Sequence, residues 1–126
     1  MSWNIVLFVG AGGFLGAVLR FLLSTFIQRG VNTLFPVGTL SVNVLGSFII
    51  GFLALYFEEV IAPEYKALAV TGFLGALTTF STFSYETVSM LQSGEYYKAF
   101  LNVGLNVVFC VGATIAGMYV FRLVYR

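Results

Sequence analysis

The stretch GFLGALTTFSTFS, residues 72–84, combines two glycines with five hydroxyl side chains within seven positions, near the middle of a long apolar segment. Gly, Ser and Thr form helices less readily than Ala or Leu. Non-helical backbone at that depth in a membrane survives only where it is buried in protein or faces a watered cavity. We therefore interpret the stretch as a break in a membrane-spanning helix. The alternative is an intact helix whose hydroxyl groups bond back to its own carbonyls.

Four apolar segments are long enough to cross a bilayer, which takes roughly 20 mostly apolar residues. They cover about residues 5–27, 38–57, 67–90 and 99–124. The short connections hold most of the charge and both prolines, so consecutive helices are expected to run antiparallel. We predict an all-α membrane protein in which residues 1–126 form a single four-helix transmembrane domain. The first span lacks a preceding basic region and is long, so we expect it to be retained rather than cleaved as a signal.

The composition narrows the class of protein further. Of the 126 residues, 60% are hydrophobic and 9% are charged, against about 25% charged in soluble domains. A net charge of +1 provides no basic surface for nucleic acid. The chain has no His and no Asp, which excludes Ser-His-Asp catalysis and His-ligated zinc. We expect membrane lipid around the protein, no enzyme activity and no nucleic-acid partner.

The basic residues are divided evenly between the two sides of a four-span topology. Three fall on each side: Lys66, Arg122 and Arg126 against Arg20, Arg29 and Lys98. Since the Lys/Arg bias of short loops sets orientation, we predict insertion in both orientations. Two inverted copies can then pair as an antiparallel, dual-topology homodimer; the alternative is one topology with a weak bias.

A bundle of four short helices has little free space once side chains fill it, so a pathway is expected at the dimer interface. Small residues let membrane helices approach closely. We expect the following glycines to serve such contacts: Gly12, Gly16, Gly46, Gly51, Gly112 and Gly117.

The break itself offers two kinds of ion site. Carbonyls freed at Gly75 and Thr78, contributed by both copies, suit a hard cation without any carboxylate. Phe80 and Phe83 are three residues apart and project near each other on a helix. Their ring edges carry weak positive potential that suits a small anion, although such a pair is also typical of an ordinary core.

Polar residues on the second and fourth spans extend this set. Asn43 places an amide donor inside the second span. Asn102, Asn106, Cys110 and Thr114 are each four apart and align in one stripe along the fourth. The stripe is either interhelical glue or a track for a solute.

Two charged residues lie within the spans. Arg20 is interpreted as a vestibule residue that concentrates anions, or as a side chain that snorkels to the interface. Glu86 would repel anions, so we expect a structural role for it.

Together these residues resemble the CrcB/Fluc family of bacterial fluoride channels over essentially the full length. Three stretches carry the resemblance: GAVLR at 16–20, GTLSVN at 38–43 and residues 72–86. The resemblance implies a dual-topology homodimer with two pores in the bacterial inner membrane. These pores export fluoride passively and so protect the cell from fluoride toxicity.

The resemblance also implies roles for particular residues. Phe80 and Phe83 form an aromatic box, and Asn43 donates from the pore. The carbonyls of Gly75 and Thr78 from both subunits hold a central structural sodium ion, and Arg20 lies in the vestibule. Hydroxyls of the break complete the donors: Thr79, Ser81 and Thr82. Asn106 and Cys110 stand in the polar track where other members have His or Ser.

Two other functions compete with this interpretation. A proton-coupled small multidrug transporter also has four short spans, but it needs a carboxylate on the first helix, and residues 5–27 contain none. A non-transporting membrane subunit would use its polar stripes only for assembly.

Overall fold

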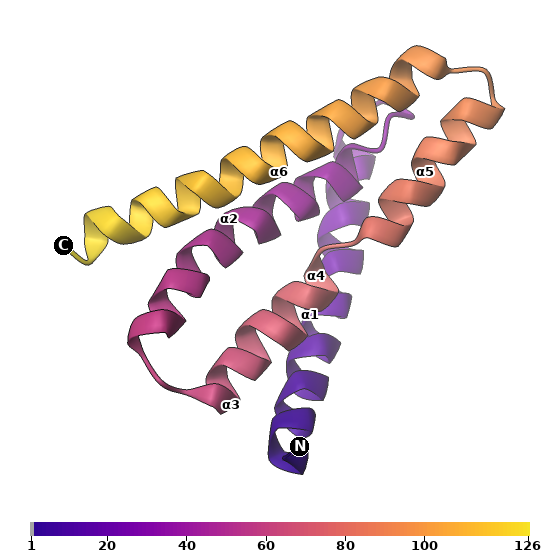
Figure 1. Ribbon diagram of the computed structural model, residues 1–126. Coiled ribbons are helices and arrows are strands. Elements are labelled where there is room, and N and C mark those ends of the chain that lie inside the picture. Colours follow the sequence, from indigo (N-terminus) through magenta and orange to yellow (C-terminus); the bar gives the residue numbers. More distant parts are fainter. Residues whose placement is uncertain (1) are drawn as a thin grey trace.

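The computed structural model describes residues 2–126, and within that range it contains four helical segments long and apolar enough to cross a membrane (Figure 1). The first, second and fourth are α1 (Trp3–Gly30), α2 (Val37–Glu59) and α6 (Tyr96–Val124). The third, Pro63–Gln92, is composite. The prediction of four spans is confirmed. Most helices begin or end a few residues outside the predicted bounds, so most of the charged residues expected in the loops lie in terminal helical turns.

The third span changes its backbone geometry several times. It begins with α3 (Pro63–Lys66), continues as a π-helix, η1 (Ala67–Leu74), and ends its first half with α4 (Gly75–Leu77). After two extended residues, α5 (Phe80–Gln92) begins in a new direction (Figure 1). The predicted break is therefore confirmed and lies between Leu77 and Phe80. The π-helix was not predicted, because nothing in an apolar run distinguishes five-residue from four-residue hydrogen bonding.

The break is stabilised locally by its own hydroxyl residues. Thr78 and Thr79 have extended backbone, with ψ angles of 156° and 123°. Thr79 is the N-cap of α5: its Oγ1 accepts a hydrogen bond of 3.2 Å from the N–H of Thr82. Such a cap satisfies one of the free N–H groups at a helix start. Residues 80–84 of the hydroxyl-rich stretch are accordingly helical, and only its centre is irregular.

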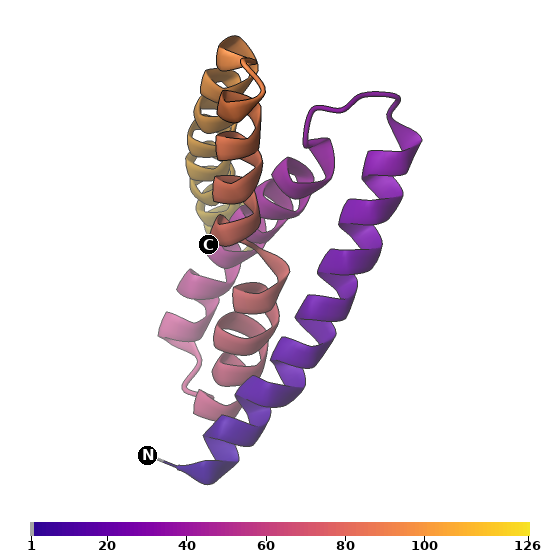
Figure 2. The ribbon, with the colours of Figure 1, turned by 90° about the vertical axis from the view of Figure 1, so that its right-hand side faces the viewer.

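Helices that follow each other in the chain are not the closest neighbours. α2 packs mainly along α6, and α1 packs mainly along η1 (Figures 1 and 2). Each of these pairs runs in the same direction, as expected where successive spans alternate. The break therefore separates a part of the third span that packs on α1 from a part, α5, that packs on α6.

Glycines supply the close contacts within these pairs. α1 meets η1 at Gly12 and Gly16, and α2 meets α6 at Gly51 and Gly117; a β-carbon added at any of them would collide with the backbone of the opposite helix. We expected these glycines at a dimer interface. That expectation was wrong for these four, which are used inside the chain because two helices with small residues can approach backbone to backbone. Gly46 likewise faces the γ-methyl of Thr78, whereas Gly112 has open space around it.

The outer surface is largely apolar. Along α1 alone, Phe14, Phe21 and Phe26 are exposed. Such a surface is what lipid tails or another membrane subunit would cover.

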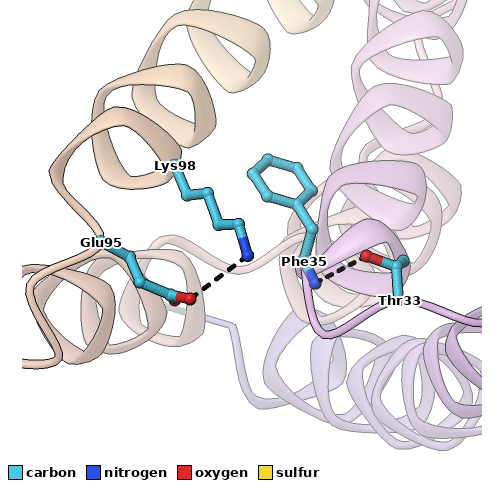
Figure 3. Close-up of polar contacts among 4 residues, drawn as sticks. All are labelled: Thr33, Phe35, Glu95 and Lys98. Carbon is cyan, nitrogen blue, oxygen red and sulfur yellow. Dashed lines mark hydrogen bonds and ion pairs between the residues drawn. The ribbon is translucent and has the colours of Figure 1, made fainter.

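Polar and charged groups gather at the connections. The loop after α1 and the turn before α6 lie at the same end of the molecule (Figures 1 and 2). Figure 3 shows two of their contacts: Lys98 pairs with Glu95 at 3.2 Å, and the N–H of Phe35 donates to Thr33 Oγ1 at 3.1 Å. These loops therefore resemble a water-facing rim.

Candidate functional site

A cavity of about 800 Å³ opens on the surface between α2, the break, α5 and α6. Eight of the eleven predicted site residues line it: Asn43, Gly75, Thr78, Thr79, Phe80, Phe83, Asn106 and Cys110. Ser81, Thr82 and Arg20 are not among its lining residues. The remaining walls are mostly aliphatic, and within residues 2–126 no carboxylate lines the cavity. The site thus brings neutral polar groups together inside an apolar wall.

The side-chain amide of Asn43 hydrogen-bonds to the backbone of the break, in place of the helical partners that Thr79 lacks. The side-chain Oδ1 accepts from the N–H of Thr79 at 2.8 Å, and its Nδ2 donates to the carbonyl of Thr79 at 3.1 Å. One amide thus satisfies both polar groups of a residue that has left the helix, which a buried site requires. The second N–H of Asn43 donates to Asn106 Oδ1 at 3.2 Å.

A further line of hydrogen bonds continues from Asn106. Its Nδ2 donates to the carbonyl of Asn102 at 2.9 Å and to Asn102 Oδ1 at 3.1 Å. Asn102 then donates to Thr87 Oγ1 at 3.0 Å, and Thr87 donates to the carbonyl of Phe83 at 2.8 Å. Thus α2, α6 and α5 are joined through buried amides. The four-residue spacing places Asn102 in the α6 stripe without indicating a specific role, and no sequence pattern points to Thr87.

The carbonyls of Gly75 and Thr78 are among those that lose their usual helical donors at the break. The N–H four residues after Gly75 belongs to Thr79 and is given to Asn43. The N–H four residues after Thr78 belongs to Thr82 and is given to Thr79 Oγ1. Gly75 is also exposed at the surface of the chain. Both residues predicted to offer free carbonyls have therefore lost their i+4 donors to side chains.

The residues present fit a hard cation held by carbonyls. Among residues 2–126 there is no group of three or more His, Cys, Asp or Glu side chains that could hold a metal ion. Carbonyl oxygens are the ligands that such cations accept in the absence of carboxylates.

Phe80 and Phe83 lie together at the start of α5. Their ring centroids are 5.4 Å apart and the ring planes are inclined by 61°, an edge-on arrangement. Phe83 is 8% exposed, whereas Phe80 is 80% exposed. The expected proximity is therefore present, but only Phe83 is enclosed by this chain.

The hydroxyls of the break form a small cluster. Thr79 Oγ1 donates to Thr82 Oγ1 at 3.2 Å, and it lies 3.3 Å from Ser81 Oγ. Ser81 is exposed, and Thr82 is half-buried. Of this cluster Thr79 lines the cavity, whereas Ser81 and Thr82 lie outside its walls.

The α6 stripe divides into parts with different environments. Thr114 donates to the carbonyls of Ser47 at 3.0 Å and Cys110 at 3.1 Å, and so joins α6 to α2. Asn102 and Asn106 are buried and bonded as described above. Cys110 also lines the cavity, and the described residues provide no hydrogen bond to its thiol. Three of the four stripe residues thus form hydrogen bonds with other helices, and Asn106 and Cys110 line the cavity.

Arg20 and Glu86 both keep one polar atom buried. Arg20 Nε and Glu86 Oε1 have no hydrogen-bond partner among the described residues. Glu86 lies beside the hydroxyl of Thr39, which is buried in the first turn of α2. Neither Arg20 nor Glu86 is among the residues that line the cavity.

The comparisons with known proteins agree on one family. Residues 7–118 match the family model described as CrcB-like protein, Camphor Resistance (CrcB). A relative from a Sulfurovum species is 65% identical over 125 residues, 99% of both chains. One from a Nitratiruptor species is 56% identical over 125 residues, 99% of this chain and 98% of its own. A third, from Campylobacter fetus, is 44% identical over 127 residues, 99% of both. Each of the three is named fluoride-specific ion channel FluC.

Proposed function

This chain belongs to the CrcB family, and on that premise we propose that it is a fluoride-selective ion channel of the bacterial plasma membrane. It exports fluoride passively and so protects the cell from fluoride toxicity. The observation that carries the proposal is the cavity at the break, where amides, hydroxyls and an edge-on phenylalanine pair meet and no carboxylate of residues 2–126 is among the lining groups.

The chemistry of this cavity suits a small anion that must lose its water. Neutral N–H and O–H donors can replace the hydration shell of fluoride, and the positive edges of Phe80 and Phe83 add to them. Selectivity against chloride follows from a narrow, donor-rich passage, since the two anions carry the same charge. Hydrogen fluoride enters a cell as a neutral acid and dissociates, and the trapped anion leaves down its own gradient.

In this proposal Asn43 stabilises the break with one N–H group and donates the other to the ion. Both of its N–H groups already have acceptors, Thr79 and Asn106. A fluoride ion that reaches Asn43 therefore replaces Asn106 Oδ1 as the acceptor of one N–H. The bond to Thr79 remains and holds the amide in place.

The pathway is completed by a second copy in the inverted orientation. Phe80 and Gly75 are exposed in one chain although they belong to the proposed site, and an apolar, open cavity in a membrane protein needs a cover. An antiparallel homodimer brings two breaks together and yields two pores. The even division of basic residues allows both orientations to be inserted.

The carbonyls of Gly75 and Thr78 from both copies would hold a structural sodium ion. When bound there, such an ion would supply positive charge that balances the negative ends of these carbonyl dipoles. The support is that both carbonyls have lost their i+4 donors to side chains.

Two alternatives are less well supported. A proton-coupled multidrug transporter needs an acidic residue facing its substrate, and neither α1 nor the cavity has one in residues 2–126. A purely structural subunit does not need a cavity that gathers eight predicted site residues.

The test is fluoride efflux from liposomes that contain the purified protein and potassium fluoride. A channel releases fluoride rapidly only after a potassium ionophore is added, because charge must be balanced, and a fluoride electrode follows the release. Potassium chloride liposomes are the control for selectivity. Retention of fluoride equal to that of protein-free liposomes would refute the proposal.

A further inference from the structure

A continuous chain of hydrogen bonds, which we name the amide relay, runs from Asn43 through Asn106 and Asn102 to Thr87 and ends on the carbonyl of Phe83. Its four links measure between 2.8 and 3.2 Å. It crosses from α2 to α6 and back to α5. The relay therefore connects the residue that closes the break to the turn that carries the aromatic pair.

The direction of the relay is fixed by backbone groups at its two ends. The carbonyl of Phe83 can only accept, and the N–H of Thr79, which binds Asn43 Oδ1 at 2.8 Å, can only donate. Each amide between them must give its N–H toward Phe83 and its oxygen toward Asn43. Turning Asn102 by half a rotation would place its N–H groups against those of Asn106. Asn102 therefore sets the orientation of Asn106, and Asn106 that of Asn43.

Burial makes this arrangement sensitive to the loss of any member. Asn102 is 1% exposed, Asn106 7% and Asn43 9%. Water cannot easily replace a missing partner at such positions, and an unsatisfied buried amide is costly.

Asn102 itself does not line the cavity, whereas Asn43, Asn106 and Thr87 do. It can affect an ion only through its neighbours. The aromatic pair lies between the two ends of the relay in the sequence. One end is bonded to Thr79, just before Phe80, and the other ends on the carbonyl of Phe83. An intact relay thus fixes the amide of Asn43 and is bonded to the helical turn that carries the rings.

We propose that Asn102 is a positioning residue for conduction, which acts through Thr87 on Phe83 and through Asn106 on Asn43. This inference rests on the proposed fluoride channel. It assigns Asn102 a role in conduction beyond joining α6 to α5 by hydrogen bonds.

The test is a double-mutant cycle in the liposome efflux assay. Asn102→Leu and Thr87→Val are each expected to lower fluoride flux about tenfold, which corresponds to the loss of one buried hydrogen-bond partner. Because both remove the same link, the double variant is also expected to lose about tenfold rather than a hundredfold. Thr87→Ser keeps the hydroxyl and restores flux. Ser89→Ala is the matched control on α5, since its side chain makes no hydrogen bond with the described residues.

Several outcomes would overturn the relay. Wild-type flux in an assembled Asn102→Leu protein is one, and effects of the two variants that multiply are another, since Thr87 would then act on the ion directly. Should Asn102→Leu not assemble, nuclear magnetic resonance of side-chain amides in Thr87→Val decides. The Asn43 resonances must shift, although Asn43 is three hydrogen bonds away, and they must not shift in Ser89→Ala. Unshifted resonances refute the relay, whereas an inactive wild-type protein refutes the channel alone.

Discussion

The two halves of the third span are held in place by different forces. The first half, η1, lies against α1 with backbones in contact at Gly12 and Gly16, so its position is set by shape. The second half, α5, is anchored by hydrogen bonds from Asn43 and Asn102. Glycine contacts fix the distance between two helices, whereas amide hydrogen bonds also fix the orientation of the groups they join, and losing one of these bonds costs stability. The proposed ion-contacting residues lie where orientation matters.

The largest effect on stability is expected at the glycine contact between α1 and η1. Gly12→Ala places a methyl group on the carbonyl of Leu68, and neither helix backbone can retreat without losing the contact. We expect a loss of about 3 kcal/mol or more in the free energy of unfolding. A denaturant titration in detergent micelles, followed by circular dichroism, measures it.

Gly10→Ala is the matched control on the same helix, because nothing lies within 4 Å of the added carbon. Its stability should equal or slightly exceed that of the wild type, since Ala is the better helix former. Equal stability of the two variants would show that shape does not hold η1.

At the second half of the third span, α5, replacing a hydrogen-bond donor is expected to matter more than adding volume. Asn43→Asp keeps the size of the side chain and the acceptor for Thr79, but its ionised carboxylate offers no proton to Thr79 or Asn106. It also places a negative charge on the anion path. We expect fluoride flux per assembled protein to fall about a hundredfold at neutral pH, equivalent to about 3 kcal/mol, in the liposome assay.

Asn32→Asp, in the exposed loop after α1, makes the same chemical change away from the site. It should conduct like the wild type. If Asn43→Asp conducted equally well, Asn43 could be neither a donor to the ion nor the anchor of the break.

Phe80 and Phe83 are expected to affect conduction alike but stability differently. Phe80→Ile and Phe83→Ile should each lower flux about tenfold, because the polarised ring edge is lost while volume is roughly kept. Only Phe83 is enclosed by the chain, so Phe83→Ile should also cost about 1 kcal/mol of stability. Efflux and micelle unfolding measure the two quantities. Phe26→Ile, on the exposed face of α1, should change neither, and normal flux in both pair variants would rule out the aromatic box.

Sequence patterns predicted the spans and the break because both depend on local composition. Runs of apolar residues define the spans, and the cluster of Gly, Ser and Thr at 72–84 marks the irregular backbone. The same patterns could not show which groups meet across helices. Gly12 and Gly16 contact η1 rather than a second copy, and Asn102 bonds to Thr87 fifteen residues earlier. Those contacts depend on how the helices are rotated, which no single span determines.

The smallest effect is expected where the end of α5 meets water. Lys98 and Glu95 form an ion pair of 3.2 Å beside the turn before α6, with side chains 49% and 43% exposed (Figure 3). Exposed pairs contribute little, since solvent screens the charges and two long side chains must be ordered. The variants Glu95→Gln and Lys98→Gln should therefore each change the free energy of unfolding by less than about 0.5 kcal/mol, with no added loss in the double variant. If instead removing this pair lowered the free energy of unfolding as much as Gly12→Ala is expected to, then charge at the rim, and not the buried amides, would hold the second half of the span.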